Sequence, residues 1–402
     1  MKKTVSYSDL VAVLDERQRS FTKDTSGNQE VYKLLQYVKR TTPTWFRPYE
    51  VKGWTDIVPN KENRIPIIAV KKKRLIDNSK TEIQDIKCLI HFIEAYPLDK
   101  EKEYTISMDG LHAIYPCLQE LDAMIGMKQL KETVLDQLLF FIQDLHKHTS
   151  DKKESLDFMH TVIYGPPGTG KTEIAKLMGQ LYSKLGILKK GTFRKVTRSD
   201  LIAGYLGQTA IKTRDVIQDC LGGVLFIDEA YALGCNDKRD SFSKECIDTL
   251  CEALSNYKEE LMVIIAGYED ELKVGFFNQN PGLESRFTWR FKTDDYTAEE
   301  LYRIFLKKVN ECGWKIDPGC NLTSKWFETH MKYFSFFGRD MENLLAKIKI
   351  VHGRRVFCKP TKDKKLLTMV DIEKGCQSYL ASDAIKNRKE SNRSYLDNTM
   401  YV

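Results

Sequence analysis

The chain has 402 residues, 42% of them hydrophobic and 30% charged, with a net charge of +7. This composition is typical of a globular protein and excludes a fibrous or wholly disordered chain. The longest apolar runs, 138–142 and 261–267, are far shorter than the ~18 residues that a membrane-spanning helix needs, so we expect no membrane partner.

Residues 1–113 contain no recognisable motif, and we predict that they form an N-terminal α+β region that acts as an adaptor and selects substrates. Residues 1–80 hold 17 Lys and Arg against 9 Asp and Glu, a balance of +8, so the remaining residues sum to −1. Such a basic segment is typical of binding to nucleic acid or an acidic partner, although a solvated lysine-rich surface is the simpler interpretation.

The expected location is a reducing, cytoplasmic compartment. Ten cysteines lack any Cys-x-x-Cys pair, and the first residues show no apolar core of a secretion signal. The basic run 71–74 leaves a nuclear address as the alternative.

Residues 114–292 have the pattern of an α/β nucleotide-binding domain. An apolar stripe at helical spacing predicts a helix within 115–148; its members are Leu130, Val134, Leu138, Phe141 and Leu145. Four apolar runs then alternate with amphipathic segments, which predicts a parallel sheet with crossover helices. The predicted strands are 158–164, 193–197, 223–227 and 261–266.

The segment 165–172 matches the P-loop pattern in full and lies between a predicted strand and a predicted helix. Glycines let backbone N–H groups surround phosphate oxygens, and the helix N-terminus adds positive potential. Lys171 would neutralise the β- and γ-phosphates of ATP, and the Thr172 hydroxyl would bind Mg²⁺. The predicted nucleotide-binding residues are Gly165, Pro166, Pro167, Gly168, Thr169, Gly170, Lys171 and Thr172.

Asp228 and Glu229 follow the third predicted strand, a run of four apolar residues. Ligands collect at the carboxyl ends of the strands in such sheets. Asp228 would therefore hold Mg²⁺, directly or through water, and Glu229 would activate the attacking water as a general base. The presence of Glu229 indicates hydrolysis rather than nucleotide binding alone.

Residues 293–380 show helical periodicity and are predicted to form a C-terminal helical lid, followed by a polar tail, 381–402. Arg286 lies just before this region, where an arginine can reach a γ-phosphate bound by a neighbouring subunit; Arg290 is the nearby competitor. Arg339 opens a predicted lid helix and would sense the nucleotide. A surface salt bridge is the alternative for either arginine.

The order of P-loop, Asp-Glu strand, Arg286 and Arg339 resembles an AAA+ ATPase module over about two-thirds of the chain. Within that superfamily, segments 205–210, 222–233, 265–268 and 280–283 resemble the CbbX/SpoVK-type subfamily, and ATPases of this type encoded by large DNA viruses are also similar. The resemblance implies a hexameric ring with shared ATP sites. It also implies that Ile125 and Gly126 contact adenine.

The segment Tyr205-Leu206-Gly207 stands where related rings carry the aromatic of a central pore loop. An aromatic offers a large, rigid contact area, and the flanking glycines allow the loop to move. Packing of Tyr205 beneath the sheet is the interpretation without the family resemblance. One departure is the end of the fourth strand, which reads Ala-Gly-Tyr268, so the residue that orients the attacking water is unassigned.

We therefore predict an α/β P-loop ATPase with a helical lid. It would bind ATP and Mg²⁺, form a homo-oligomer and remodel a protein substrate through a pore, as a chaperone-like machine. Two alternatives remain: a nucleic-acid motor that uses the basic N-terminus, and an ATP-gated scaffold with slow turnover. The absence of Lys and Arg from residues 201–211 argues against a loop that tracks phosphates.

Overall fold

The computed structural model describes residues 74–76, 82–99, 102–104, 106–148, 155–156, 158–205, 207–234, 240–382 and 385. The chain divides into two units after residue 70, and all described residues belong to the second unit. The basic segment 1–73, Leu206 and most of the predicted tail thus lie outside the described residues.

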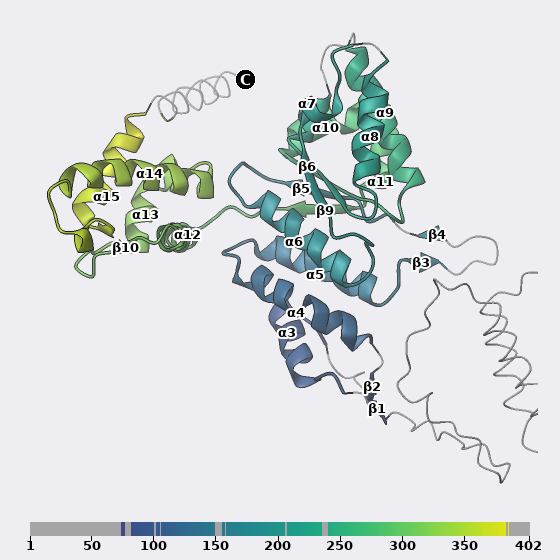
Figure 1. Cartoon of the computed structure of the whole chain (residues 1–402), viewed down its shortest axis with the longest axis horizontal. Coiled ribbons are helices and arrows are strands. Elements are labelled where there is room, and N and C mark those ends of the chain that lie inside the picture. Colours follow the sequence, from purple (N-terminus) through teal and green to yellow (C-terminus); the bar gives the residue numbers. More distant parts are fainter. Residues whose placement is uncertain are drawn as a thin grey trace, which may run out of the picture. The chain divides into compact units, whose positions relative to one another are not determined.

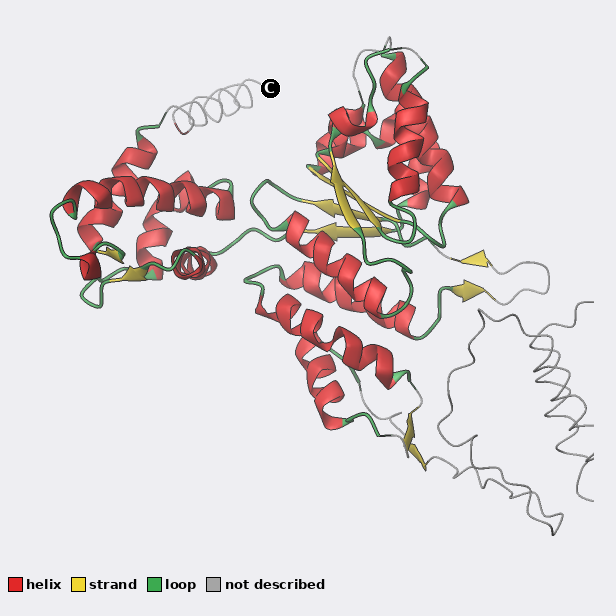
Figure 2. Cartoon of the chain, viewed as in Figure 1, coloured by secondary structure: helices red, strands yellow, loops and turns green. Residues whose placement is uncertain are grey.

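A five-stranded parallel sheet in the order β6-β7-β8-β5-β9 forms the centre of the nucleotide-binding part (Figures 1 and 2). It confirms the predicted α/β class, and four of its strands coincide with the four predicted runs. The fifth, β9, pairs with β5 and was not among them. The strands are β5 (Thr161–Tyr164), β6 (Phe193–Val196), β7 (Val224–Asp228), β8 (Met262–Gly267) and β9 (Trp289–Lys292).

Helices cover both faces of this sheet because alternate residues of its strands point to opposite sides. In β7, Val224 and Phe226 belong to one apolar cluster with α3 to α6, whereas Leu225 and Ile227 belong to a second with α8 to α11. All four of these β7 side chains are buried. On the first side, α5 (Lys128–Ile142) and α6 (Lys171–Lys184) lie on the sheet, and α3 (Ile86–Ala95) and α4 (Met108–Ala123) pack beyond them (Figure 1). The helices of the second side are α7 (Arg198–Leu201), α8 (Thr209–Asp219), α9 (Ser241–Asn256), α10 (Glu269–Gly275) and α11 (Pro281–Arg286).

The segment 115–148, which the apolar stripe predicted to contain a helix, contributes to two helices rather than one. Gly126 and Met127 have left-handed backbone conformations, with φ of 70° and 56°, and separate α4 from α5. Helix α5 ends at Ile142, Asp144 is again left-handed, and Leu145 is 56% exposed. The stripe therefore ends one member earlier than predicted. The predicted boundary at 113/114 falls inside α4, which packs against α6.

The C-terminal part is a helical lid, as predicted, with one addition. Strands β10 (Lys315–Ile316) and β11 (Leu366–Leu367) form a small parallel pair between its helices. Its core contains Leu301, Phe305 and Met341 with neighbouring apolar side chains. The lid helices are α12 (Ala298–Glu311), α13 (Ser324–His330), α14 (Phe337–Arg355) and α15 (Met369–Leu380).

Two further short pairs complete the described strands: β1 (Arg74–Ile76) with β2 (Lys102–Tyr104), and β3 (Lys147–His148) with β4 (Ser155–Leu156). Within the described ranges, none of the helices has both the length and the apolar character needed to cross a bilayer.

Candidate nucleotide-binding and hydrolysis site

The P-loop connects β5 to α6 through backbone conformations that favour glycine. Gly168 and Gly170 have φ of 81° and 85°, in the left-handed region that side chains disfavour. Gly170 is also the N-cap of α6 and provides no side-chain hydrogen bond to the first helical N–H groups. The N–H groups of that first turn are therefore available to an anion, in line with the helix dipole.

Lys171 places its amine inside this loop. The side chain is buried, and Nζ donates to the carbonyl oxygens of Gly165 at 2.8 Å and Pro166 at 2.7 Å. Burial lowers the pKa of Lys171 to about 8, and the charge of Asp228 opposes part of that shift. The amine thus lies where phosphate oxygens can replace carbonyl partners, and a bound anion would favour its charged form.

Asp228 and Glu229 stand at the carboxyl end of β7, beside the P-loop. Asp228 is half-buried, and its Oδ2 lies 2.6 Å from Nζ of Lys195 on the adjacent strand β6. Glu229 is exposed, and its backbone is left-handed with φ of 53°. Both residues line the pocket described below; the Asp228 carboxylate is paired with Lys195, whereas Glu229 is exposed.

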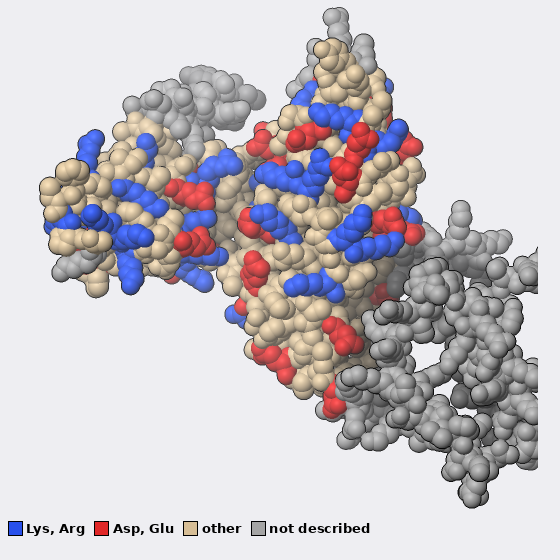
Figure 3. Space-filling model, in the orientation of Figure 1, with Lys and Arg blue, Asp and Glu red and all other residues tan. Residues whose placement is uncertain are grey.

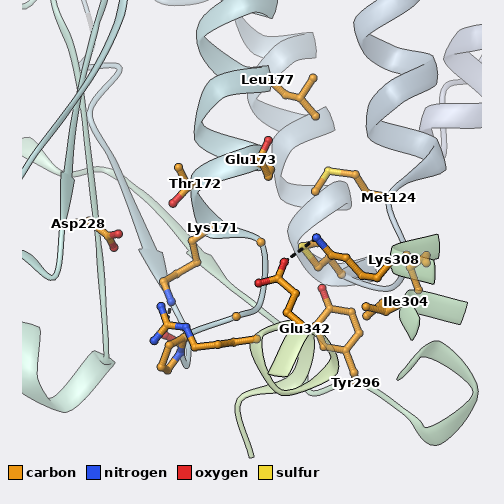
Figure 4. Close-up of a pocket in the computed structure, with 18 of the residues that line it drawn as sticks. Met124, Lys171, Thr172, Glu173, Leu177, Asp228, Tyr296, Ile304, Lys308 and Glu342 are labelled. Carbon is orange, nitrogen blue, oxygen red and sulfur yellow. Dashed lines mark hydrogen bonds and ion pairs between the residues drawn. The ribbon is translucent and has the colours of Figure 1, made fainter. Parts of the chain in front are cut away.

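A pocket of about 700 Å³ joins these groups to the lid (Figure 4). In Figure 4, Lys171, Thr172 and Asp228 lie on one side, and Met124, Ile304 and Tyr296 on the other. One end of the pocket thus offers charge and hydroxyl groups, and the other offers apolar contacts. The predicted residues that line it are Ile125, Gly165, Pro167, Gly168, Gly170, Lys171, Thr172, Asp228, Glu229 and Arg339.

Three predicted nucleotide contacts do not line this pocket. Pro166 and Thr169 belong to the loop itself, where the Thr169 hydroxyl donates to the Pro166 carbonyl at 2.9 Å. Gly126 packs against the ring of Tyr296, and a Cβ there would stand 2.7 Å from that ring. Gly126 therefore contributes through close packing of the α4–α5 turn on the lid.

The apolar end contains residues that the sequence did not indicate. Met124, Leu177, Tyr296 and Ile304 line it, and they come from four separate segments, so no local motif unites them. Only the helical period of α6 and α12 could have suggested Leu177 and Ile304 as inward-facing. A pocket with an apolar wall and a phosphate-binding loop fits a nucleotide, with its base on the apolar side.

The lid contacts the P-loop directly. The Gly338 N–H donates to the Gly168 carbonyl at 3.1 Å, and the Tyr296 hydroxyl donates to the Thr169 carbonyl at 3.1 Å. A Cβ on Gly168 would collide with the backbone of Phe336. Arg339 is exposed and lines the pocket beside this contact. Within the lid, Lys308 and Glu342 form an ion pair at 2.7 Å that also borders the pocket (Figure 4).

Arg286 lies away from this pocket, at the end of α11. Its Nε donates to the Ser255 hydroxyl at 2.6 Å, and its guanidinium also bonds the Gly282 carbonyl. Arg290 pairs with Glu284 at 3.0 Å and lies over the ring of Phe277. The structure does not bring either arginine to the nucleotide pocket of its own chain.

The segment between α7 and α8 presents Tyr205 to solvent, with 74% of the residue exposed. A Cβ added at Gly204 or at Gly207 would meet no atom within 4 Å, so there is free space beside both glycines that flank Tyr205 in the sequence. Leu206 lies outside the described residues. Packing of Tyr205 beneath the sheet, the alternative interpretation, is wrong for this structure.

The predicted ligands for Mg²⁺, Thr172 in the P-loop and Asp228 at the end of β7, both line the pocket. A hydroxyl and a carboxylate are the hard oxygen ligands that Mg²⁺ prefers, together with phosphate oxygens and water. Among the residues that the structure describes, no group of three or more His, Cys, Asp and Glu could hold a metal by itself. A metal at Thr172 and Asp228 would need phosphate oxygens or water to complete its coordination. Tyr268, the first residue after β8, also lines the pocket.

The fold and this site define a P-loop nucleoside triphosphatase with a helical lid. The family model described as "ATPase family associated with various cellular activities (AAA)" matches residues 161–290. Three relatives extend the likeness beyond that range.

A mimivirus protein (Acanthamoeba polyphaga mimivirus) described as cfxQ-like is 36% identical over 317 residues, 78% of this chain and 75% of that protein. The chloroplastic ribulose bisphosphate carboxylase/oxygenase activase of Cyanidioschyzon merolae is 32% identical over 278 residues, 68% of this chain and 92% of the relative. Stage V sporulation protein K of Bacillus subtilis is 35% identical over 261 residues, 62% of this chain and 80% of the relative. The chain belongs to the AAA ATPase family, in the group that includes SpoVK and CbbX. It is an ATPase, and the predicted resemblance is confirmed.

Proposed function

We propose that this ATPase hydrolyses Mg-ATP between the subunits of a homo-oligomeric ring, a hexamer by likeness to the family, and uses the energy to remodel a protein through a central pore. The observation that carries this proposal is the exposure of Tyr205. A large aromatic held in solvent between two glycines fits a moving grip on polypeptide better than a structural anchor.

The stem of this loop is joined to the hydrolysis site, which supports coupling between the two. Arg198, the first residue of α7, donates to the carbonyls of Ala232 and Leu233 at 2.7 and 3.1 Å, shortly after Asp228 and Glu229 in the chain. It also pairs with Asp240 at 2.8 Å, the N-cap of α9. A shift of the segment after Glu229 would therefore move Arg198 and, with it, the start of the segment that carries Tyr205.

Each side chain of the site has a proposed task. Lys171 and the α6 N-terminus would bind and orient the phosphates, Thr172 and Asp228 would hold Mg²⁺, and Glu229 would take a proton from the attacking water. Mg²⁺, when bound, supplies neutralisation of the phosphate charge. Arg339 would contact the nucleotide from the lid of the same chain.

Arg286 would reach the γ-phosphate of a neighbouring subunit. Its position away from its own chain's pocket supports that role, because a finger supplied in trans belongs outside the pocket of the chain that carries it. The partner is then a second copy of this chain.

The client is a protein in this proposal, since one relative is named as an activase of a protein enzyme. No residue described above points to that same client. On the face shown in Figure 3, acidic and basic side chains are interspersed, so this face does not favour the alternative of a nucleic-acid motor.

A substrate trap tests the proposal. Glu229→Gln should bind ATP without hydrolysis, and the trapped protein would be purified from its host with and without nuclease. A protein that co-purifies only with ATP, survives nuclease and is lost on Tyr205→Ala would support threading. Nucleic acid as the retained partner would contradict it, and wild-type turnover that is slow and indifferent to every retained protein would favour the scaffold. Lys171→Ala should abolish nucleotide binding; retained binding would refute the P-loop assignment.

A further inference from the structure

Lys195 is a positively charged residue beside Asp228, the proposed metal ligand, and the proposed hydrolysis mechanism gives it no role. It lies on β6, whose register with β7 places Lys195 opposite Phe226, two residues before Asp228. Its Nζ contacts Asp228 Oδ2 at 2.6 Å and lies 5.9 Å from the centre of the Phe226 ring. The lysine side chain is 45% exposed and the aspartate 26%.

The neighbouring residue on the same strand gives a direct comparison. Arg194 makes an ion pair of equal length, 2.6 Å, with Asp219, whose side chain is 68% exposed. That pair is an ordinary surface contact. The Lys195 pair differs because its carboxylate is more buried and is the one that the proposed function assigns to Mg²⁺.

A lysine ammonium and a divalent metal compete for the same carboxylate. Both are attracted to its negative charge, and two cations at one oxygen repel each other. A metal, or its water shell, that binds Oδ2 displaces the ammonium from that oxygen, and one that binds Oδ1 still meets the repulsion of the nearby ammonium charge.

We propose that Lys195 is the built-in counter-cation of Asp228 and competes with the divalent metal for this carboxylate, so that it sets the metal concentration at which the site fills. This inference rests on the proposed role of Asp228. It has two consequences: Lys195 weakens metal binding, and it allows a nucleotide to bind in the absence of metal by offsetting the carboxylate charge.

The test measures metal binding rather than turnover. Mn²⁺ would be titrated into the full-length protein with saturating ADP, and free Mn²⁺ would be followed by its electron paramagnetic resonance signal. Lys195→Met keeps the aliphatic stem and removes the charge. It should lower the half-saturating Mn²⁺ concentration about three- to tenfold, given a partly exposed pair.

A second measurement detects the other consequence. Binding of a fluorescent ADP in the presence of EDTA should weaken about threefold or more in Lys195→Met, because the Asp228 charge then faces the phosphates without an offset. Lys195→Arg should resemble the wild type in both measurements. Arg194→Met is the matched control and should change neither.

Asp228→Asn separates this inference from the function on which it rests. If Asp228→Asn does not weaken Mn²⁺ binding, the metal assignment itself fails. If it does, and Lys195→Met leaves Mn²⁺ binding unchanged or weaker, only the competition is overturned. Loss of ADP binding in Lys195→Met both with and without metal, at an unchanged melting temperature, would also overturn it.

Discussion

Glu229 combines three features at the scale of one residue: it follows a buried strand, has a left-handed backbone and is exposed at the pocket. Replacement of Glu229 by Gln keeps the shape and removes the base.

We expect Glu229→Gln to lower the rate of ATP hydrolysis about 10²- to 10⁴-fold, the usual contribution of a general base, while nucleotide affinity stays within a few-fold of the wild type. Steady-state phosphate release and fluorescent-nucleotide binding would measure the two quantities. Asp270→Asn, an exposed acid in the first turn of α10, is the control and should change neither. A Glu229→Gln variant with wild-type turnover would remove Glu229 from the mechanism.

His160 is a buried histidine that ties three elements together. Its Nδ1 accepts from the Val263 N–H at 3.1 Å, so its Nε2 carries the proton and donates to the Leu254 carbonyl at 3.0 Å. Burial lowers the pKa of His160 to about 4, although the Leu254 carbonyl opposes the shift and Arg286 adds to it. The neutral ring is therefore the form that the fold requires.

This shift predicts a loss of stability in mild acid. Between the unfolded pKa near 6.5 and the folded pKa of about 4, the unfolded chain takes up a proton that the folded chain refuses. The free energy of unfolding should thus be full above pH 6.5 and fall by about 3 kcal/mol as pH drops to 4. Urea unfolding across this range would measure it. His160→Gln should flatten this part of the profile, and the exposed His91→Gln should not; an unchanged slope in His160→Gln would contradict the assignment.

At the scale of the elements, one buried carboxylate between α14 and α15 holds the lid together. Asp371 is 1% exposed, accepts from Arg355 Nε at 2.8 Å and from the Thr368 N–H at 2.9 Å, and lies 3.1 Å from His352 Nδ1. Burial alone would raise the pKa of Asp371, but the hydrogen bonds from Arg355 and Thr368 outweigh it and hold the pKa well below its usual range.

We expect Asp371→Asn to lower the free energy of unfolding by about 3 kcal/mol, because it leaves the Arg355 charge without its partner and weakens the cap of α15. Chemical denaturation followed by circular dichroism would measure the loss. Glu373→Gln, at an exposed acid on the same helix, should cost little. Equal stability of the two variants would mean that the network stabilises less than its geometry indicates.

At this scale, sequence periodicity predicted β5, β7 and β8, which are buried almost throughout, and also β6, although Arg194 and Lys195 interrupt its apolar residues. It missed β9, although the alternation of aromatic and basic residues over 289–292 is typical of a half-exposed strand. It also extended α5 past Ile142, because Leu145 kept the helical spacing although Asp144 breaks the helix. Backbone breaks at non-glycine residues carry no strong local signal, so the pattern could not reveal them.

The same limit holds for the site. The P-loop and the Asp-Glu pair are each contiguous in the sequence and could be predicted from it. The apolar wall of the pocket instead combines side chains from the end of α4, from α6 and from the lid, which are far apart in the sequence. Lys195 was invisible for the same reason, since its partner lies 2.6 Å away in space but in another strand.

For the whole molecule, the proposed ring makes each site the property of two chains. We expect Arg286→Ala alone to lower turnover about 10³-fold or more, with nucleotide binding retained. Arg290→Ala should lower it far less. Assembly would be checked by light scattering with and without ATP.

Mixing inactive chains tests the shared site. Glu229→Gln chains still supply Arg286, so equal mixing with Arg286→Ala chains should restore about a quarter of the sites in a ring assembled at random. If Arg286 acts within its own chain, the mixture should remain as inactive as its components. Recovery after mixing would therefore identify the direction of the contact.

The sheet order also bears on synthesis of the chain. Strand β5, which leads into the P-loop, pairs with β8 and β9, so its neighbours on both sides are encoded about a hundred residues or more downstream. At ~5–20 residues per second, a ribosome exposes β5 for on the order of ten seconds before β9 emerges. During that interval the backbone N–H and C=O groups along both edges of β5 have no native partner strand, and the lid residues that contact the P-loop do not yet exist. The nascent chain is therefore expected to depend on a holding chaperone until the ribosome has passed the lid.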